Sequence, residues 1–246
     1  SLISWSSAMI TERQQKLLEK IIKEFVASAQ PVSSKSLEES GFLGISSATI
    51  RSGMNELERA GYLEQPHTSA GRVPTDKAYR FFVDKIVKAQ PVEIGDREKR
   101  KIDASIHDTL PEPREVNKSI AQVLSELSDN LVITNIVDED DFFKVGLKSL
   151  FEFPEFREFE RMFRLTSFFE EFEREVRRFH DVQVFIGHES PFHNINEEAI
   201  ICAEYRLPNG FTGSVVMVGP TRMNYQRNMG LVNYTKNKVD ELYESR

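Results

Sequence analysis

Hydrophobic residues recur at three- and four-residue spacing through the first ninety residues of the chain, as they do along helices that bury one side. This pattern predicts four helices, over 11–30, 33–40, 46–61 and 75–89. Two short strands are expected over 62–64 and 72–74, with a turn-rich tip between them. Three helices with a two-stranded wing are typical of a winged helix-turn-helix domain.

The rest of the chain mixes helical spacing with the alternating and β-branched runs of strands. A helix is expected over 115–130 and a β-rich run over 131–137, which ends at the acidic residues 138–141. Three further strands are expected over 182–187, 199–207 and 211–219. Asn209-Gly210 suits a tight hairpin between the last two. With a final helix from Thr221 to 243, the pattern predicts a mixed α/β domain around an antiparallel sheet.

Phenylalanines at helical spacing mark the segment 155–180. They are Phe156, Phe159, Phe163, Phe168, Phe169, Phe172 and Phe179. We expect one or two amphipathic helices here. An apolar stripe on a helix faces the interior far more often than it lines a ligand pocket, so we interpret these rings as core.

A polar, charged run divides the two patterned regions. It covers Gln90 to Arg100 and contains Pro91 and Gly95, which interrupt regular structure. The predicted organisation is a winged-helix DNA-binding domain over 1–90, a linker over 91–100 and a second domain over 101–246.

The helix over 46–61 has an apolar and a polar side. Its buried stripe is Ile50, Met54 and Leu57, and Gly61 suits a left-handed C-terminal cap. We expect the polar side to face a DNA groove through Ser47, Thr49, Arg51, Ser52 and Asn55. Arginine can bind guanine or a phosphate at such a place, and asparagine can read adenine.

A purely structural interpretation of the same residues stays open. Ser46, Ser47 and Thr49 could only cap the helix, because a hydroxyl there accepts a hydrogen bond from a first-turn amide. Arg51 could pair with Glu56 or Glu58 on its own helix.

Neighbouring segments extend the predicted DNA contact. A backbone phosphate is expected at the start of the preceding helix, beside Ser33, Ser34 and Lys35. In the wing, phosphate or minor-groove contacts are expected from His67, Thr68, Ser69 and Arg72. Gly71 lets the backbone approach closely.

The net charge of −7 is divided unevenly along the chain. Residues 1–90 hold 12 Lys and Arg against 10 Asp and Glu, whereas residues 91–246 hold 20 against 29. This asymmetry favours phosphate contact in the first domain. The start, SLISWSSAM, lacks the features of a signal peptide. No apolar run is long enough for a membrane helix. The single cysteine fits a reducing compartment. We therefore expect a cytoplasmic protein with no membrane contact.

Enzyme chemistry finds little support in the sequence. His188 and His193 lie on either side of Glu189, as metal ligands can, but the segment is a loop and has no third ligand nearby. Cys202 lies in a predicted strand without a local histidine, so we expect a packed thiol rather than a nucleophile. No phosphate-binding glycine motif occurs. We expect neither catalysis nor a cofactor.

The order of these segments resembles that of HrcA, a family of heat-inducible transcription repressors. The most specific stretch is EQPHTSAGRVPTDKAYR, which begins at Glu64. Further similar segments are TERQQKLLEKIIKEF (11–25), PVSSKSLEES (31–40), VGLKSLFEFPEF (145–156) and GPTRMNYQRNMGLVNYT (219–235).

The resemblance implies a homodimer that binds double-stranded DNA at an inverted-repeat operator of the CIRCE type, upstream of chaperone operons. It also implies a GAF-like mixed α/β dimerisation domain with a smaller inserted domain, and the chaperonin GroEL as a partner that keeps the repressor active. An alternative is a winged-helix regulator of another regulon whose GAF-like domain senses a small ligand, and a third possibility is a dimerising scaffold that has lost its regulation.

This chain departs from the family pattern in two places. Only about seven residues join Val137 to Val145, where the family has a much longer stretch, so the inserted domain is expected to be absent or reduced. Ser52-Gly53 replaces a more polar pair. A glycine within a helix costs about 1 kcal/mol relative to alanine, and the serine can shift base preference.

Overall fold

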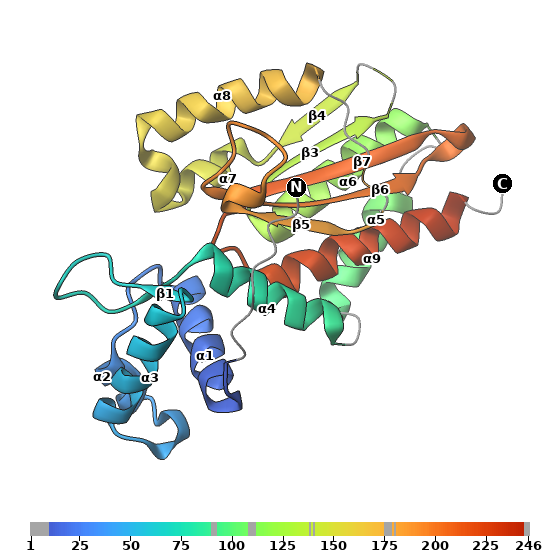
Figure 1. Ribbon diagram of the computed structural model, residues 1–246. Coiled ribbons are helices and arrows are strands. Elements are labelled where there is room, and N and C mark those ends of the chain that lie inside the picture. The colour runs from blue at the N-terminus through green and yellow to red at the C-terminus, as the bar shows by residue number, and fades with distance from the viewer. Residues whose placement is uncertain are drawn as a thin grey trace. The chain divides into compact units, whose positions relative to one another are not determined.

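The computed structural model describes residues 10–89, 93–107, 112–137, 139, 141–174, 179 and 181–243. The chain divides into two compact units, 1–85 and 86–246 (Figure 1). No helix within the described residues is long and apolar enough to cross a bilayer.

The first unit is a winged helix-turn-helix. Its elements are α1 (Glu12–Ser28), α2 (Ser34–Glu39), a 3-10 turn (Phe42–Gly44), α3 (Ser47–Arg59), β1 (Leu63–Glu64), β2 (Val73–Pro74) and most of α4 (Asp76–Lys88), whose last residues belong to the second unit. β1 and β2 pair antiparallel to form the wing. The largest fully buried side chains between the helices include Leu18, Ile21, Ile22, Leu37, Ile50 and Leu57. These residues belong to the apolar stripes that predicted the helices.

Local capping explains where these helices begin and end. Thr11 and Gln14 form the predicted capping box at α1, and Ser46 caps α3. Gly61 has a φ of 78° and donates its N–H to the Glu58 carbonyl, while the next N–H bonds to the Leu57 carbonyl. This pair of bonds is the Schellman arrangement, which satisfies the last carbonyls of α3 and turns the chain into the wing.

The second unit contains a five-stranded sheet between two layers of helices. Its helices are α5 (Asp96–His107), α6 (Pro113–Ser128), α7 (Leu147–Glu152), α8 (Phe159–Arg174) and α9 (Tyr225–Tyr243). Its strands are β3 (Leu131–Ile136), β4 (Phe142–Val145), β5 (Gln183–Ile186), β6 (Glu198–Arg206) and β7 (Thr212–Pro220). Their order is β4-β3-β7-β6-β5, with every neighbouring pair antiparallel. This is the GAF-like architecture that the resemblance implied.

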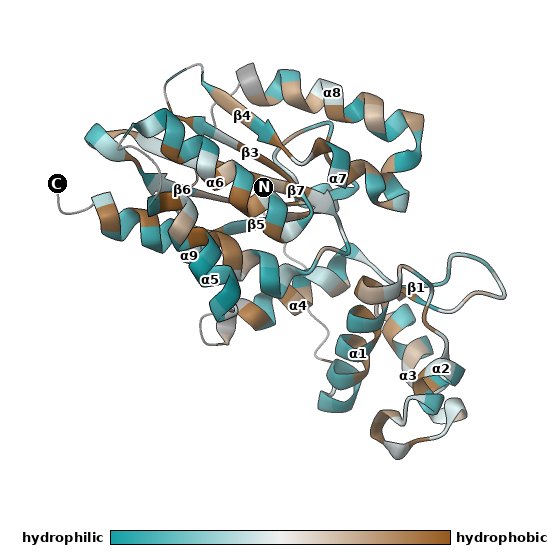
Figure 2. Cartoon of the chain, turned by 180° about the vertical axis from the view of Figure 1, so that it is seen from behind, coloured by the Kyte–Doolittle hydropathy of each residue, from teal (hydrophilic) through white to brown (hydrophobic). Residues whose placement is uncertain are grey.

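The two faces of this sheet are buried by different helices (Figure 1). On one face α7 and α8 pack their side chains against the strands, in a cluster that includes Leu150, Phe156, Leu165, Phe168, Phe172, Ile133, Ile200 and Val216. On the other face α6 contacts β3 and α9 contacts β6. Figure 2 shows largely hydrophobic colours along the central strands, and β3 is buried at every position, as expected for strands covered on both sides.

Several expectations need correction in this unit. Asp96–His107 is a helix, so the second half of the predicted linker range is the start of α5. β4 and α7 follow the acidic break without having been predicted. The last helix begins at Tyr225 and is capped by Asn224, whose Oδ1 accepts from the N–H of Arg227, rather than by Thr221.

The phenylalanine segment is partly core, as predicted, and partly surface. Phe156, Phe168, Phe172 and Phe179 are buried. Phe159 and Phe163, however, are 80% and 64% exposed at the start of α8. The interpretation of the whole stripe as core is therefore wrong for these two residues, because the packed side of α8 follows Leu165 and Phe168 instead.

Candidate nucleic-acid interface

The outward side of α3 lies opposite its buried stripe. Ser52 is exposed there, and Arg51 is exposed at the edge of this side. Within the part of the chain that the structure describes, no hydrogen bond or ion pair involves the guanidinium of Arg51. The donors of this guanidinium are therefore not used by the described residues.

Asn55 and Arg72, both expected to contact DNA, bind each other. Arg72 Nη2 donates to Asn55 Oδ1 over 3.2 Å, and Arg72 Nε donates to Glu58 Oε2 over 3.0 Å. The Arg72 side chain is only 15% exposed and forms an ion pair with Glu58. Arg72 thus fastens the wing to α3, and Glu58 neutralises the charge that was expected to meet a phosphate.

The hydroxyls of Ser34 and Ser47 are also used within the unit. Ser34 is only 8% exposed, and Ser47 Oγ donates to Ser34 Oγ over 3.0 Å. This bond joins the first turns of α2 and α3, so the Ser34 hydroxyl is used within the unit, while a phosphate contact at the start of α2 stays a prediction. Ser33 caps α2, and Lys35 is exposed with its Nζ 3.7 Å from Glu39 Oε1.

The other hydroxyls of α3 take part in local bonds. Ser46 Oγ lies 3.0 Å from Thr49 Oγ1 and accepts from the Thr49 N–H. Ser52 Oγ donates to Glu56 Oε1 over 3.5 Å, and Gln14 Nε2 of α1 donates to Glu56 Oε2 over 2.8 Å. The capping interpretation therefore holds for Ser46, whose hydroxyl also bonds to that of Thr49, and Glu56 is oriented from two sides.

The tip of the wing displays three polar side chains. His67, Thr68 and Ser69 are exposed, as a contact with DNA requires. Gln65 shapes this tip, because its Nε2 donates to the carbonyls of Thr68 (3.0 Å) and Ala70 (2.9 Å). Sequence analysis missed this role of Gln65, since no spacing rule identifies a side chain that bonds to its own loop.

The base of the wing is tied to the segment before α2. Val32 and Arg72 exchange backbone hydrogen bonds of 2.9 and 2.8 Å. A Cβ on Gly71 would lie far inside van der Waals contact of the Val32 carbonyl. The close approach that Gly71 permits is therefore made by the protein's own backbone.

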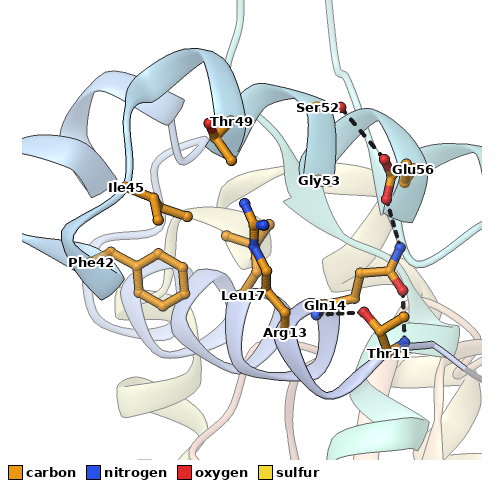
Figure 3. Close-up of a pocket in the computed structure, with 10 residues that line it drawn as sticks. All are labelled: Thr11, Arg13, Gln14, Leu17, Phe42, Ile45, Thr49, Ser52, Gly53 and Glu56. Carbon is orange, nitrogen blue, oxygen red and sulfur yellow. Dashed lines mark hydrogen bonds between the residues drawn. The ribbon is translucent and has the colours of Figure 1, made fainter.

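A hollow of about 250 Å³ opens beside α3 (Figure 3). α1 and its cap contribute Thr11, Arg13, Gln14 and Leu17, the turn before α3 contributes Phe42 and Ile45, and α3 contributes Thr49, Ser52, Gly53 and Glu56. A Cβ on Gly53 would lie 2.8 Å from Leu17 Cδ2, so the glycine lets α3 approach α1. Sequence analysis did not assign Arg13 to the site.

Most lysine and arginine side chains of the first unit form ion pairs with carboxylates. Nζ–carboxylate or guanidinium–carboxylate contacts join Lys16 to Glu12, Lys20 to Glu24, Arg80 to Asp84 and Lys85 to Glu19. The hydrogen bond from Lys16 lowers the pKa of Glu12. Among the described residues, by contrast, Arg13, Lys23, Arg51 and Arg59 have no such partner.

Two residues considered for enzyme chemistry lie in the second unit. Cys202 is fully buried, and burial raises the pKa of its thiol well above the usual range, which disfavours the nucleophilic thiolate. His193 is exposed, and its Nδ1 lies 3.0 Å from Glu171 Oε1. Within the described residues, no three His, Cys, Asp or Glu side chains gather as metal ligands.

A winged helix-turn-helix with an exposed arginine on the second helix of the pair is typical of DNA-binding proteins. Residues 75–229 match the family model described as the HrcA protein C terminal domain. The chain belongs to the HrcA family, which is a family of transcription repressors and not of enzymes.

Curated relatives carry the name heat-inducible transcription repressor HrcA. The protein from Acetivibrio thermocellus is 25% identical over 339 aligned positions, which cover 96% of this chain and 97% of that protein. The protein from Chlorobium limicola is 45% identical over 131 residues, 52% of this chain and 36% of that protein. A crystal structure of a hypothetical protein matches the fold with a TM-score of 0.81 at 20% identity, over 96% of this chain and 99% of that one.

The first of these alignments also shows that this chain is shortened. An alignment of 339 positions cannot be filled by 246 residues, so at least 93 positions (339 minus 246) face a gap in this chain. A gap of this size agrees with the expected loss or reduction of an inserted domain.

Proposed function

We propose that this chain is a cytoplasmic repressor that binds a CIRCE-type inverted repeat upstream of chaperone operons as a homodimer. The observation that carries the proposal is the outward side of α3, where Arg51 is exposed and free of any described partner. Membership of the HrcA family supports the repressor role.

Arg51 and the side chains around it would contact different parts of the DNA. Arg51 would bind the edge of a guanine, and Ser52 would contact a neighbouring base or phosphate. Asn55 gives one lone pair of Oδ1 to Arg72, which orients the amide and leaves its Nδ2 donor available to a base. The exposed wing residues His67, Thr68 and Ser69 would contact the backbone or the minor groove.

Neighbouring parts of α2 and α3 would support these contacts. Lys35 remains available to a phosphate, since its exposed pair with Glu39 is worth at most about 1 kcal/mol. Ser33, Ser47 and Thr49 would act mainly by fixing the first turns of α2 and α3.

A palindromic site follows from twofold symmetry of the protein. In a homodimer held by the GAF-like unit, two copies of α3 would enter successive major grooves, and their separation would set the half-site spacing. The chaperonin GroEL is the partner we propose for control of the repressor, on the basis of the family alone.

Selection of DNA by the purified full chain tests this proposal. From a random duplex library we expect recovery of an inverted repeat, and a footprint over both half-sites. Arg51→Ala should lose the specific site while keeping weak binding to unrelated duplex, because base contacts specify and phosphate contacts only position. Lys23→Ala removes an equally free charge from α1 and serves as the control. Recovery of unrelated sequences, or wild-type selectivity of Arg51→Ala, would overturn the proposal.

A further inference from the structure

We propose that Arg13, in the first turn of α1, contacts a backbone phosphate on the side of α3 that is turned away from the wing. This inference rests on the proposed DNA binding and adds to it a residue from a helix outside the helix-turn-helix pair. On this proposal the arginine that binds a phosphate on this side of the site is Arg13 of α1, and not Arg72 at the base of the wing.

The geometry of α3 places two arginines on opposite flanks of its exposed side. Asn55 and Glu58 contact Arg72, whereas Thr49, Gly53 and Glu56 line the hollow together with Arg13. At about 100° per residue these two sets lie on opposite sides of the helix. The exposed Ser52 lies between the two flanks, and the exposed Arg51 lies on the same flank as Asn55 and Glu58.

The two flanking arginines differ in the charge that they can offer. Arg72 is 15% exposed and paired with Glu58, so a phosphate would have to compete with a carboxylate at 2.9 Å. Arg13 is exposed, and none of the described residues pairs with it. Figure 3 shows its side chain extending from α1 toward α3, between Leu17 and Thr49. A DNA strand on this flank would therefore meet an uncompensated guanidinium.

Glu56 is the opposing charge on the same flank. Gln14 donates to its carboxylate and holds it at the end of the hollow away from Phe42 (Figure 3). Because this carboxylate repels a phosphate, we expect the phosphate to lie nearer to Arg13 than to Glu56. Glu56→Gln should then strengthen DNA binding, most at low salt, because the amide oxygen can still accept from Gln14 while the charge is removed.

Salt titration of DNA binding by the full chain measures the Arg13 contact. For Arg13→Ala we expect the slope of log K against log salt to fall by about 0.9 for each bound copy, since one phosphate contact is lost. Arg13→Lys keeps the charge and should retain most of the slope. Lys23→Ala, which removes a free cation elsewhere on α1, should leave the slope at the wild-type value. A thermal melt establishes that each variant is folded.

A second measurement locates the phosphate. Neutral methylphosphonates are placed one at a time along the selected duplex, and each is tested with wild type and Arg13→Ala. At one position per half-site, we expect the substitution to weaken wild type but not Arg13→Ala, which is the coupling that a direct contact produces.

The outcomes separate this inference from the proposed function. If wild type binds the inverted repeat but Arg13→Ala behaves like Lys23→Ala and shows no coupled phosphate, the role of Arg13 is overturned and the proposed function stands. If wild type does not bind duplex DNA with a salt-dependent affinity, the proposed function and this inference both fall.

Discussion

Arg72 links the wing to the recognition helix through one side chain. Arg72→Ala removes the ion pair with Glu58 and the hydrogen bond to Asn55. The pair is only partly screened from water, so we expect the free energy of unfolding to fall by about 1–2 kcal/mol. Urea denaturation of the full chain measures the loss, with Lys23→Ala as the control. An unfolding curve equal to that of the control would show that Arg72 does not hold the wing.

We expect Glu198 to make the stability of the second unit depend on pH. It is 2% exposed, and burial raises the pKa of its carboxyl above the usual 4.5, although Arg161 opposes the shift. The folded state therefore binds this proton more tightly than the unfolded chain does. Its contribution to stability is present below the unfolded pKa and is lost as pH rises through the folded pKa.

Glu198→Gln isolates this effect. The melting temperature of Glu198→Gln, relative to that of wild type, should rise as pH is raised from about 4 to about 7. The reason is that the neutral amide does not ionise, whereas the buried carboxyl of wild type becomes charged at a cost in stability. Thermal melts of both proteins across this range provide the comparison. A difference that stays constant with pH would contradict the prediction.

The wing as an element depends on its base. In Gly71→Ala the new methyl group would overlap the Val32 carbonyl, so we expect the backbone pair between Val32 and Arg72 to open. Hydrogen exchange at these two amides should speed up at least tenfold. Gly95→Ala is a suitable control, since its methyl group would meet only the Glu98 carboxylate at 3.7 Å. Unchanged exchange in Gly71→Ala would show that the base accommodates a side chain.

The elements of the first unit could be predicted because apolar spacing and capping residues agree there. Thr11, Ser46 and Gly61 act as their residue types suggest. In the second unit, α5 was missed because six of its first seven residues are charged or polar, and only Ile102 and Ile106 are buried. Strand β4 has four residues, too few for a clear alternation.

The candidate site was predictable only as far as local spacing reaches. The exposure of Arg51 follows from its place outside the buried stripe of Ile50, Met54 and Leu57. The pairing of Arg72 with Asn55 and Glu58, 17 and 14 residues away, and the position of Arg13 beside α3 depend on how the elements pack. Such tertiary contacts leave no periodic pattern in the sequence.

At the scale of the whole molecule, binding by a twofold dimer predicts that affinity depends on the helical spacing of the two half-sites. Inserting about 5 base pairs between the selected half-sites, half a helical turn, places them on opposite sides of the duplex and should reduce affinity to that of a single half-site. An insertion of about 10 base pairs should restore part of the binding. Gel mobility shifts on the three duplexes make the comparison, and equal affinity for all three would exclude a fixed dimer.

Val32 and Arg72 lie 40 positions apart in the chain, yet they pair through their backbone groups. Closing a loop of this length costs chain entropy before the pair contributes any energy. During synthesis the ribosome has to release the chain past β2, at Val73–Pro74, before this pair can close. A growing chain therefore cannot complete the wing until β2 has emerged.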